Sequence, residues 1–183
     1  MGFMSAPVIL NWLHESLSFE RSRLKQELED IYIESSMAGT FKDPDAFKTF
    51  LWKYLGFYLH YYPEFIWVAL GSDLECLGYV LGAPRSDHEE LLKIQPHLKL
   101  FENCFKRFPA HLHLNCHKNY RGVGIGGELV RTFENDIKTI SSGLHIITTT
   151  DARNRSFYLR HGLSNEFKMF YKNTPLVLMA KDL

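Results

Sequence analysis

Cysteine is scarce in this sequence of 183 residues. Cys76, Cys104 and Cys116 are odd in number, and none of them stands in a CxxC pair. A disulfide framework therefore has little support, and the spacing indicates neither a zinc site nor any other metal site. Unpaired thiols are typical of a reducing compartment, so we expect a cytoplasmic protein.

Long apolar runs and an excess of charge are missing as well. No run approaches the roughly 20 residues that a membrane span needs, and the first 16 residues lack the basic start of a signal peptide. The 21 basic and 21 acidic residues balance without a long basic stretch. We therefore expect neither a membrane nor a nucleic acid as partner. The length and the 45% apolar content fit one globular domain.

Hydrophobic periodicity and turn residues predict alternating helices and strands. The Asp43-Pro44 pair is a helix start, and Gly71 to Asp73 form a hairpin turn. The predicted elements are strand 17–23, helices 24–37 and 44–62, strands 65–70 and 75–83, helix 86–108 with a break at Pro96, strand 111–117, helix 126–140, strand 144–150, helix 153–161, and strands 165–171 and 176–181. This order indicates an α/β chain (mixed α+β) in which hairpins are combined with a crossover.

Aromatic residues mark one face of the helix predicted at 44–62. Phe47, Phe50, Tyr54 and Tyr58 recur there at helical spacing. Such a stripe most often packs into a core, and we expect it to do so here.

The most informative segment is the glycine-rich stretch that follows the strand at 111–117. Gly122, Gly124, Gly126 and Gly127 remove side chains just where a helix begins. Bare amides at a helix N-terminus can bind a phosphate, and the guanidinium of Arg121 suits a diphosphate. The segment therefore indicates a nucleotide-type cofactor bound through its diphosphate.

Two other interpretations of this segment stay open. Gly122-x-Gly124-x-x-Gly127 also fits the dinucleotide fingerprint of Rossmann folds. Only 56 residues follow Gly127, however, and the neighbouring hairpins are antiparallel, which disfavours that fold. A tight turn without any ligand would need fewer glycines.

Two separate motifs resemble the GCN5-related N-acetyltransferases (GNAT family). The first is Arg121-Gly122-Val123-Gly124-Ile125-Gly126, which matches the (Arg/Gln)-x-x-Gly-x-(Gly/Ala) signature. The second is Tyr158-Leu159-Arg160-His161-Gly162-Leu163, which matches Tyr-x-x-x-Gly-(Phe/Leu). The motifs stand in the family's order and spacing, and the resemblance covers about residues 17–181.

The resemblance implies a single GNAT-like domain at 17–183, with a central, mixed, mostly antiparallel sheet flanked by helices. Residues 1–16 would be an N-terminal extension. The segments GTFKDPDAF, YYPEF and GYVLG also look like bacterial proteins similar to the acetyltransferase-like domain at the C-terminus of O-GlcNAcases.

The family's activity implies direct acetyl transfer from acetyl-CoA to a primary amine. Its diphosphate would bind the backbone of Arg121, Gly122, Val123, Gly124, Ile125, Gly126 and Gly127. The thioester would lie along the backbone of Asn115, Cys116 and His117, and Tyr158 would protonate the leaving thiolate. The family usually has an asparagine where this chain has Asp151, so Asn154 becomes the candidate contact to the pantetheine arm.

Several functional questions stay open at the level of the sequence. His111, His113, Asn115 and His117 share one face of their strand, and His113 is our candidate general base. Glu64 or Glu75 could also serve through a water, and the acceptor amine has no signature. The alternative function is a non-catalytic module of the same fold that binds CoA or a protein partner. We expect a monomer or a homodimer.

Overall fold

The computed structural model describes residues 6–36, 41 and 43–183. Seven strands form one sheet in the order β1-β2-β3-β4-β5-β7-β6. Strands β4 and β5 pair in parallel, whereas β1–β2, β2–β3, β5–β7 and β7–β6 pair antiparallel. The predicted mixed, mostly antiparallel sheet with flanking helices is confirmed. The chain divides into two compact units, residues 1–81 with 114–133, and residues 82–113 with 134–183.

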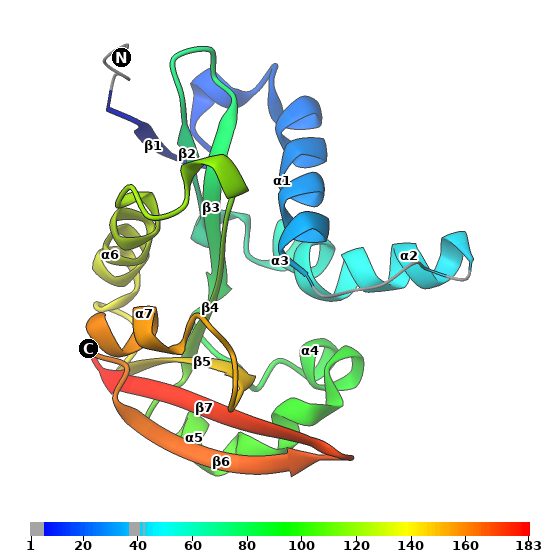
Figure 1. The fold of residues 1–183 in the computed structure, drawn as a ribbon, viewed down its shortest axis with the longest axis vertical. Helices are drawn as coiled ribbons and strands as arrows, with labels where there is room; N and C mark the ends of the chain where they lie inside the picture. The colour runs from blue at the N-terminus through cyan, green and yellow to red at the C-terminus, as the bar shows by residue number, and fades with distance from the viewer. Residues whose placement is uncertain (1–5, 37–40, 42) are drawn as a thin grey trace. The chain divides into compact units, whose positions relative to one another are not determined.

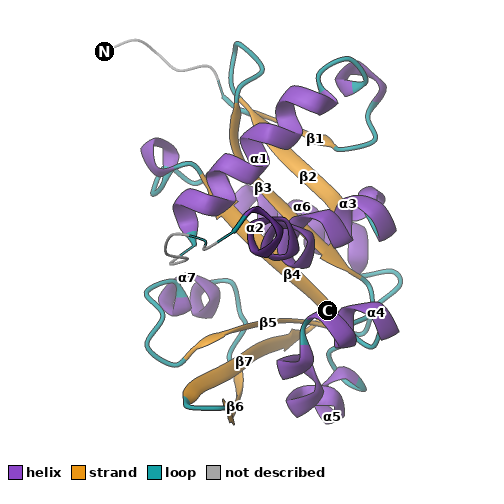
Figure 2. Cartoon of the chain, turned by 90° about the vertical axis from the view of Figure 1, so that its right-hand side faces the viewer, coloured by secondary structure: helices purple, strands orange, loops and turns teal. Residues whose placement is uncertain are grey.

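The first unit contains the N-terminal part of the sheet together with α-helices, short 3-10 helices and one π-helix. In Figures 1 and 2, α1 lies on one face of β2 and β3, and the start of α6 lies on the other. Its elements are β1 (Val8–Asn11), η1 (Glu15–Leu17), α1 (Arg21–Ser35), α2 (Pro44–Leu51), the π-helix η2 (Trp52–Gly56), α3 (Phe57–Tyr61), η3 (Pro63–Phe65), β2 (Ile66–Leu70), most of β3 (Cys76–Ala83), the end of β4 (Ala110–Cys116), η5 (Lys118–Tyr120) and the first part of α6 (Ile125–Ile137). Strand β3 belongs to this unit as far as Leu81.

The predicted strand at 17–23 is wrong. His14 accepts a hydrogen bond from the amide of Ser16, and the amide of Leu17 donates to His14 O, so these residues form a 3-10 turn. Helix α1 then begins at Arg21. Local side-chain capping therefore outweighs the apolar alternation that suggested a strand.

An edge strand lies earlier in the chain, within the segment that we expected to be an extension. Val8–Asn11 pairs with β2, with Val8 opposite Leu70 and Asn11 opposite Trp67. Residues 1–16 thus supply a strand to the sheet, and the point at which the domain begins stays a prediction.

The helices of the first unit follow the predicted periodicity. Leu24, Leu28 and Ile31 of α1 are buried, while Met37, the predicted end of this helix, lies outside the described residues. The carboxylate of Asp43 accepts from the amide of Ala46 at 2.7 Å, which confirms the predicted N-cap.

The aromatic stripe of the helix after Asp43 is only partly core. Tyr58 is buried, but Phe47, Phe50 and Tyr54 are half-buried. A π-helical turn over Trp52–Gly56 separates the two parts. Because a π turn adds a residue, it changes which side chains face inward, and Phe57 joins the core instead.

The second unit contains the hairpin of β6 and β7, which are orange and red in Figure 1. Its strand β5 pairs with β7 over its whole length, with Gly143 opposite Asp182 and Thr149 opposite Leu176. Its elements are α4 (Glu89–Ile94), η4 (Pro96–Phe101), α5 (Glu102–Phe105), the start of β4, the end of α6, β5 (Gly143–Thr149), α7 (Arg155–Arg160), β6 (Asn165–Tyr171) and β7 (Thr174–Asp182). The predicted helix break at Pro96 and the central position of β5 are confirmed.

Candidate functional site

The glycine turn between η5 and α6 has the backbone conformation that glycine favours. Gly122 has φ of 79° and Gly124 has φ of 97°, both in the left-handed region. A Cβ placed on either residue would meet no atom within 4 Å. The space beside both glycines is therefore open, so their lack of side chains is not explained by packing within the protein.

Several amides of this turn have no acceptor within residues 6–36, 41 and 43–183. The amides of Gly127 and Glu128 donate to Gly124 O at 3.0 and 3.2 Å, which starts α6. In the part of the chain that the structure describes, the amides from Gly122 to Gly126 donate to no protein group. Adjacent unpaired amides at a helix N-terminus form a site of positive potential that suits an anion.

Arg121 is held beside the turn by two contacts within the first unit. Its Nε donates to Cys116 O at 2.9 Å, and a terminal nitrogen donates to Ser35 Oγ at 3.0 Å. Lys118 Nζ forms an ion pair with Glu34 at 2.7 Å. The hydrogen bond from Lys118 lowers the pKa of the Glu34 carboxyl. The end of α1 thereby fixes the position of the turn.

Strand β4, which leads into the turn, has only a short pairing with β5. Ala110 lies opposite Leu144 and His111 opposite His145. Within the described strands, the residues of β4 from Leu112 onward have no partner in β5. An extended ligand could pair with this part of the strand through backbone hydrogen bonds.

The three residues predicted to contact the thioester differ in what their groups already bind. The amide of His117 donates to Leu77 O at 2.9 Å, so this amide is used by the protein itself. Cys116 O accepts from Arg121, and the side-chain amide of Asn115 donates to Tyr79 Oη at 3.1 Å. Successive backbone N–H groups of a strand point to opposite sides, so the amide of Asn115 faces β3 as that of His117 does. The amide of Cys116 is therefore the candidate on this strand.

The Cys116 side chain does not suit a nucleophile. Burial raises the pKa of its thiol to about 11, and Arg121 acts weakly in the opposite direction. The thiol is therefore protonated at neutral pH, whereas the thiolate is the reactive form. A Cβ on Gly78 would lie 3.0 Å from Cys116 Sγ, so Gly78 permits the close approach of β3 to β4.

Tyr158 and Asn154 belong to the second unit, in and just before α7. The Tyr158 side chain is buried, and its carbonyl accepts from the amide of Leu163 at 3.1 Å. Gly162, with φ of 85°, ends the helix as predicted. Asn154 is exposed, and its side chain does not cap the helix. The second motif is thus a short helix that ends in a glycine turn.

His113, the candidate base, is a weak base in this structure. Burial lowers the pKa of its imidazole to about 4, and the charge on His97 acts in the same direction. The ring is therefore neutral at pH 7 and able to accept a proton, but it binds that proton weakly.

A buried polar cluster in the second unit was missed by the sequence analysis. Ser86 Oγ lies 2.6 Å from His111 Nδ1 and 3.4 Å from His145 Nε2, and it donates to Pro109 O at 2.9 Å. His145 Nδ1 donates to Phe108 O at 2.7 Å. These residues are up to 59 positions apart, and nothing in the local pattern connects them. We call Ser86, His111 and His145 the serine–histidine cluster.

Burial determines the charge state of this cluster. It lowers the pKa of His145 to about 4 and the pKa of His111 well below its ordinary value. Both rings are neutral at pH 7, and the ring of Phe105 stacks on His145 at 5.1 Å. Each polar group thus has a partner, which is the arrangement expected of a structural cluster.

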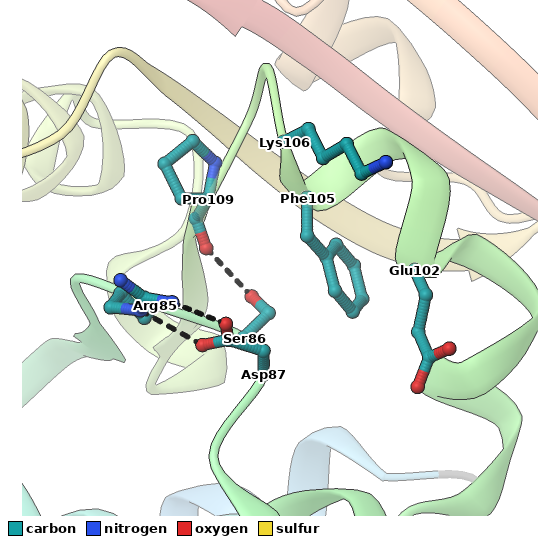
Figure 3. A pocket seen from close by; sticks show the side chains of 7 residues that line it. All are labelled: Arg85, Ser86, Asp87, Glu102, Phe105, Lys106 and Pro109. Carbon is teal, nitrogen blue, oxygen red and sulfur yellow. Dashed lines mark hydrogen bonds and ion pairs between the residues drawn. The ribbon is translucent and has the colours of Figure 1, made fainter.

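A hollow of about 400 Å³ is lined in part by Ser86 of this cluster (Figure 3). Arg85 and Asp87 pair with each other across one side of it. Its lining consists of Arg85, Ser86, Asp87, Glu102, Phe105, Lys106 and Pro109. Its two cations and two carboxylates balance, so this hollow has no charge preference comparable to that of the glycine turn.

The described ranges contain neither a cluster of metal-binding side chains nor a helix that could cross a bilayer. No three His, Cys, Asp or Glu side chains lie together as metal ligands would. Among the described helices, none has the length and apolar character that crossing a bilayer requires.

Comparisons of sequence and of structure give different results. No family model matches the sequence, and no curated protein is significantly similar to it. The structure is similar to SsHAT (TM-score 0.72, 20% identity, covering 97% of this chain and 98% of that one). It is also similar to a protein from Desulfovibrio desulfuricans assigned to the GNAT acetyltransferases (TM-score 0.62, 15% identity, 97% and 99%). The fold is that of the GNAT acetyltransferases.

A third similar structure has a ligand in its description. This is the GNAT-superfamily phosphinothricin acetyltransferase from Sinorhizobium meliloti in complex with acetyl-CoA (TM-score 0.59, 14% identity, covering 98% of this chain and 89% of that one). The GNAT fold agrees with the resemblance that the two motifs suggested, and it excludes the Rossmann alternative.

Proposed function

We propose that this protein is an acetyl-CoA-dependent N-acetyltransferase that transfers acetyl directly to a primary amine. The observation that carries the proposal is the run of amides from Gly122 to Gly126, which have no acceptor among the described residues and which include two glycines, Gly122 and Gly124, beside open space. A diphosphate would supply the acceptors that these amides lack. The S. meliloti relative in fold, which contains acetyl-CoA, supports the choice of this diphosphate ligand.

The rest of the cosubstrate would extend from the turn along β4. We assign to the amide of Cys116 a hydrogen bond to the thioester carbonyl, which would polarise that carbonyl, and to the neighbouring backbone of Asn115 and His117 contacts with the pantetheine arm. The exposed side chain of Asn154 is our candidate for a further contact with the arm. Arg121, which is already held in place, adds positive charge near the diphosphate.

Acetyl transfer then requires two proton movements. The neutral amine attacks the thioester carbonyl, the new C–N bond forms and the C–S bond breaks. We assign to the Tyr158 phenol the proton that the leaving thiolate takes up. The proton that the amine loses would pass to His113 or to solvent, and the low pKa of His113 makes it a transient acceptor.

Finer assignments rest on the sequence alone. The group similar to the C-terminal domain of O-GlcNAcases remains our prediction for the nearest relatives, as do the cytoplasmic location and the monomeric or homodimeric state.

Titration calorimetry with acetyl-CoA, and with NAD+ as the competing ligand, tests the proposal. We expect acetyl-CoA to bind. At 100 times its Kd it should raise the free energy of unfolding by about 2.7 kcal/mol, which a thermal-shift measurement detects. Binding of NAD+ without binding of acetyl-CoA would refute it.

Thiol release in the presence of an amine panel then tests catalysis. The Tyr158→Phe variant removes only the phenolic hydroxyl, so we expect kcat to fall by about 100-fold or more while the Kd for acetyl-CoA stays constant. An unchanged kcat would exclude the acid role of Tyr158. Binding of acetyl-CoA without turnover of any amine would instead favour the non-catalytic module.

A further inference from the structure

Aromatic rings gather in the first unit where α1 ends and α2 begins. Phe50 lies 5.1 Å from Tyr32 and 5.5 Å from Tyr54, and the two tyrosines lie 5.5 Å apart. Phe41 continues the group, 4.9 Å from Phe50 and 5.1 Å from Phe47. We call these five residues the aromatic cluster.

The rings of the aromatic cluster are partly exposed, whereas several residues that follow in the same segment are buried in the core. All five rings are half-buried. One turn further along the chain, Leu55, Phe57 and Tyr58 are at most 1% exposed. The buried residues of this segment therefore complete the core, and the rings of the aromatic cluster remain partly exposed at the surface. Such a surface can still bind an apolar ligand.

Tyr79 and the end of α1 connect the aromatic cluster to β4, the strand along which we place the thioester. Tyr79 is fully buried, and its hydroxyl accepts from the side chain of Asn115 on β4. Tyr32 lies on α1 three residues before Ser35, whose hydroxyl accepts from Arg121 at 3.0 Å where β4 ends and the glycine turn begins. The aromatic cluster thus begins close to β4, and a bound group there would be near the acetyl donor.

The charges around the cluster do not favour a cationic or highly polar ligand. Burial raises the pKa of Tyr32, and the other contributions come from neighbouring phenols rather than from any ion. Glu34, which is nearby on α1, is already bound by Lys118. On α2, the carboxylate of Asp45 pairs with Lys48, and that of Asp43 accepts from the amide of Ala46. A polyamine would need carboxylates, and a sugar would need several hydrogen-bonding groups; the aromatic cluster offers ring faces and a few phenols instead.

From this arrangement we infer that the acceptor of the proposed transferase is a small primary amine with an aromatic ring, and that this ring binds to the aromatic cluster. The inference rests on the proposed function, because it names the substrate class of the same reaction. Ring-to-ring packing contributes beyond simple apolar burial, so the cluster distinguishes an aromatic ring from a saturated ring of similar size.

A matched pair of acceptors tests the inference. We would measure kcat/KM for 2-phenylethylamine and for 2-cyclohexylethylamine, with spermidine, glucosamine and a lysine peptide as competitors. We expect the phenyl compound to exceed the cyclohexyl compound by about three- to tenfold, and to exceed the other acceptors. A higher kcat/KM for spermidine, the sugar or the peptide would overturn the inference.

Variants test whether the preference for the phenyl compound arises from the aromatic cluster. Phe50→Leu should remove the phenyl preference while the Kd for acetyl-CoA is unchanged. Phe19→Leu, at a ring that is 98% exposed elsewhere in the same unit, is the matched control and should keep it. If Phe50→Leu fails to fold, Tyr32→Phe and Tyr32→Leu form a second pair, of which only the leucine variant should lose the preference.

The outcomes separate this inference from the function on which it depends. If acetyl-CoA binds and another class of amine is acetylated best, or if Phe50→Leu keeps the phenyl preference, only the inference fails. If acetyl-CoA does not bind to the wild-type protein, the proposed function fails first and the inference fails with it.

Discussion

Two polar regions of this protein contrast with each other: the glycine turn at 122–126 and the serine–histidine cluster. The cluster is buried, and each of its polar groups has a protein partner. The amides of the turn are at the surface and have no protein acceptor among the described residues. Polar groups that satisfy one another stabilise a fold, whereas organised groups left without partners indicate a ligand.

The largest expected effect comes from filling the space at the glycine turn. Gly124→Glu places a carboxylate beside the unpaired amides and at a backbone conformation that disfavours side chains. We expect the affinity for acetyl-CoA to fall about 1000-fold, or about 4 kcal/mol, in titration calorimetry.

The control for Gly124→Glu is Leu74→Glu. Leu74 is also exposed and has φ of 61°, but it lies in the turn between β2 and β3. This variant introduces the same charge in the same unit and should leave the affinity unchanged. Equal losses in both variants would show that the glycine turn has no special part in binding.

The next effect concerns the serine–histidine cluster and pH. Burial lowers the pKa of His145 to about 4, so the unfolded state takes up a proton near pH 6.5 while the folded state does not. The free energy of unfolding should be constant above about pH 6.5 and fall by about 3 kcal/mol for His145 alone as the pH drops to 4. Urea unfolding at a series of pH values measures this.

His145→Asn keeps a side-chain N–H that can donate to Phe108 O but cannot titrate. We expect this variant to have a flatter dependence of stability on pH below 6.5. A dependence as steep as that of the wild type would assign the titration to other groups, such as His111 and His113, whose pKa values burial also lowers.

Removing the central hydroxyl of the cluster should have a smaller effect. Ser86→Ala leaves Pro109 O and His111 Nδ1 without their partner inside the protein. We expect the free energy of unfolding to fall by about 2 kcal/mol, with no change in the affinity for acetyl-CoA. A loss of affinity for acetyl-CoA would show that the serine–histidine cluster has a functional role as well as a structural one.

The smallest effect is expected at Arg121. Its guanidinium already binds Cys116 O and Ser35 Oγ, so only part of its charge is available to a ligand. We expect Arg121→Gln to weaken acetyl-CoA binding by about fivefold, or roughly 1 kcal/mol. Arg131→Gln, on the exposed side of α6, is the matched control and should have no effect.

The sequence was sufficient wherever structure depends on neighbours along the chain. The spacing of Leu24, Leu28 and Ile31 predicted α1, and Asp43 before Pro44 predicted the start of α2. The four glycines also predicted a turn at the start of a helix, which the structure has between η5 and α6. These features depend on helical periodicity, capping and backbone sterics, all of which are local.

Features that depend on pairing across the chain were missed. The short apolar run of β1 could have indicated a strand, but its pairing with β2 joins residues about 60 positions apart. The partners of Ser86 at 111 and 145 have no local signal. In the site, the glycines predicted a phosphate cradle, but only the structure shows that the amides of Gly127 and His117 are already used.

The π turn at Trp52–Gly56 has a consequence for how the specificity of this protein could change. It holds one residue more than an α-helical turn, so deletion of one residue there would restore a continuous α-helix. Residues on its two sides would then rotate relative to each other by about 100° around the helix axis. A single-codon deletion would thus turn the rings of α2 away from their present direction without altering any of them.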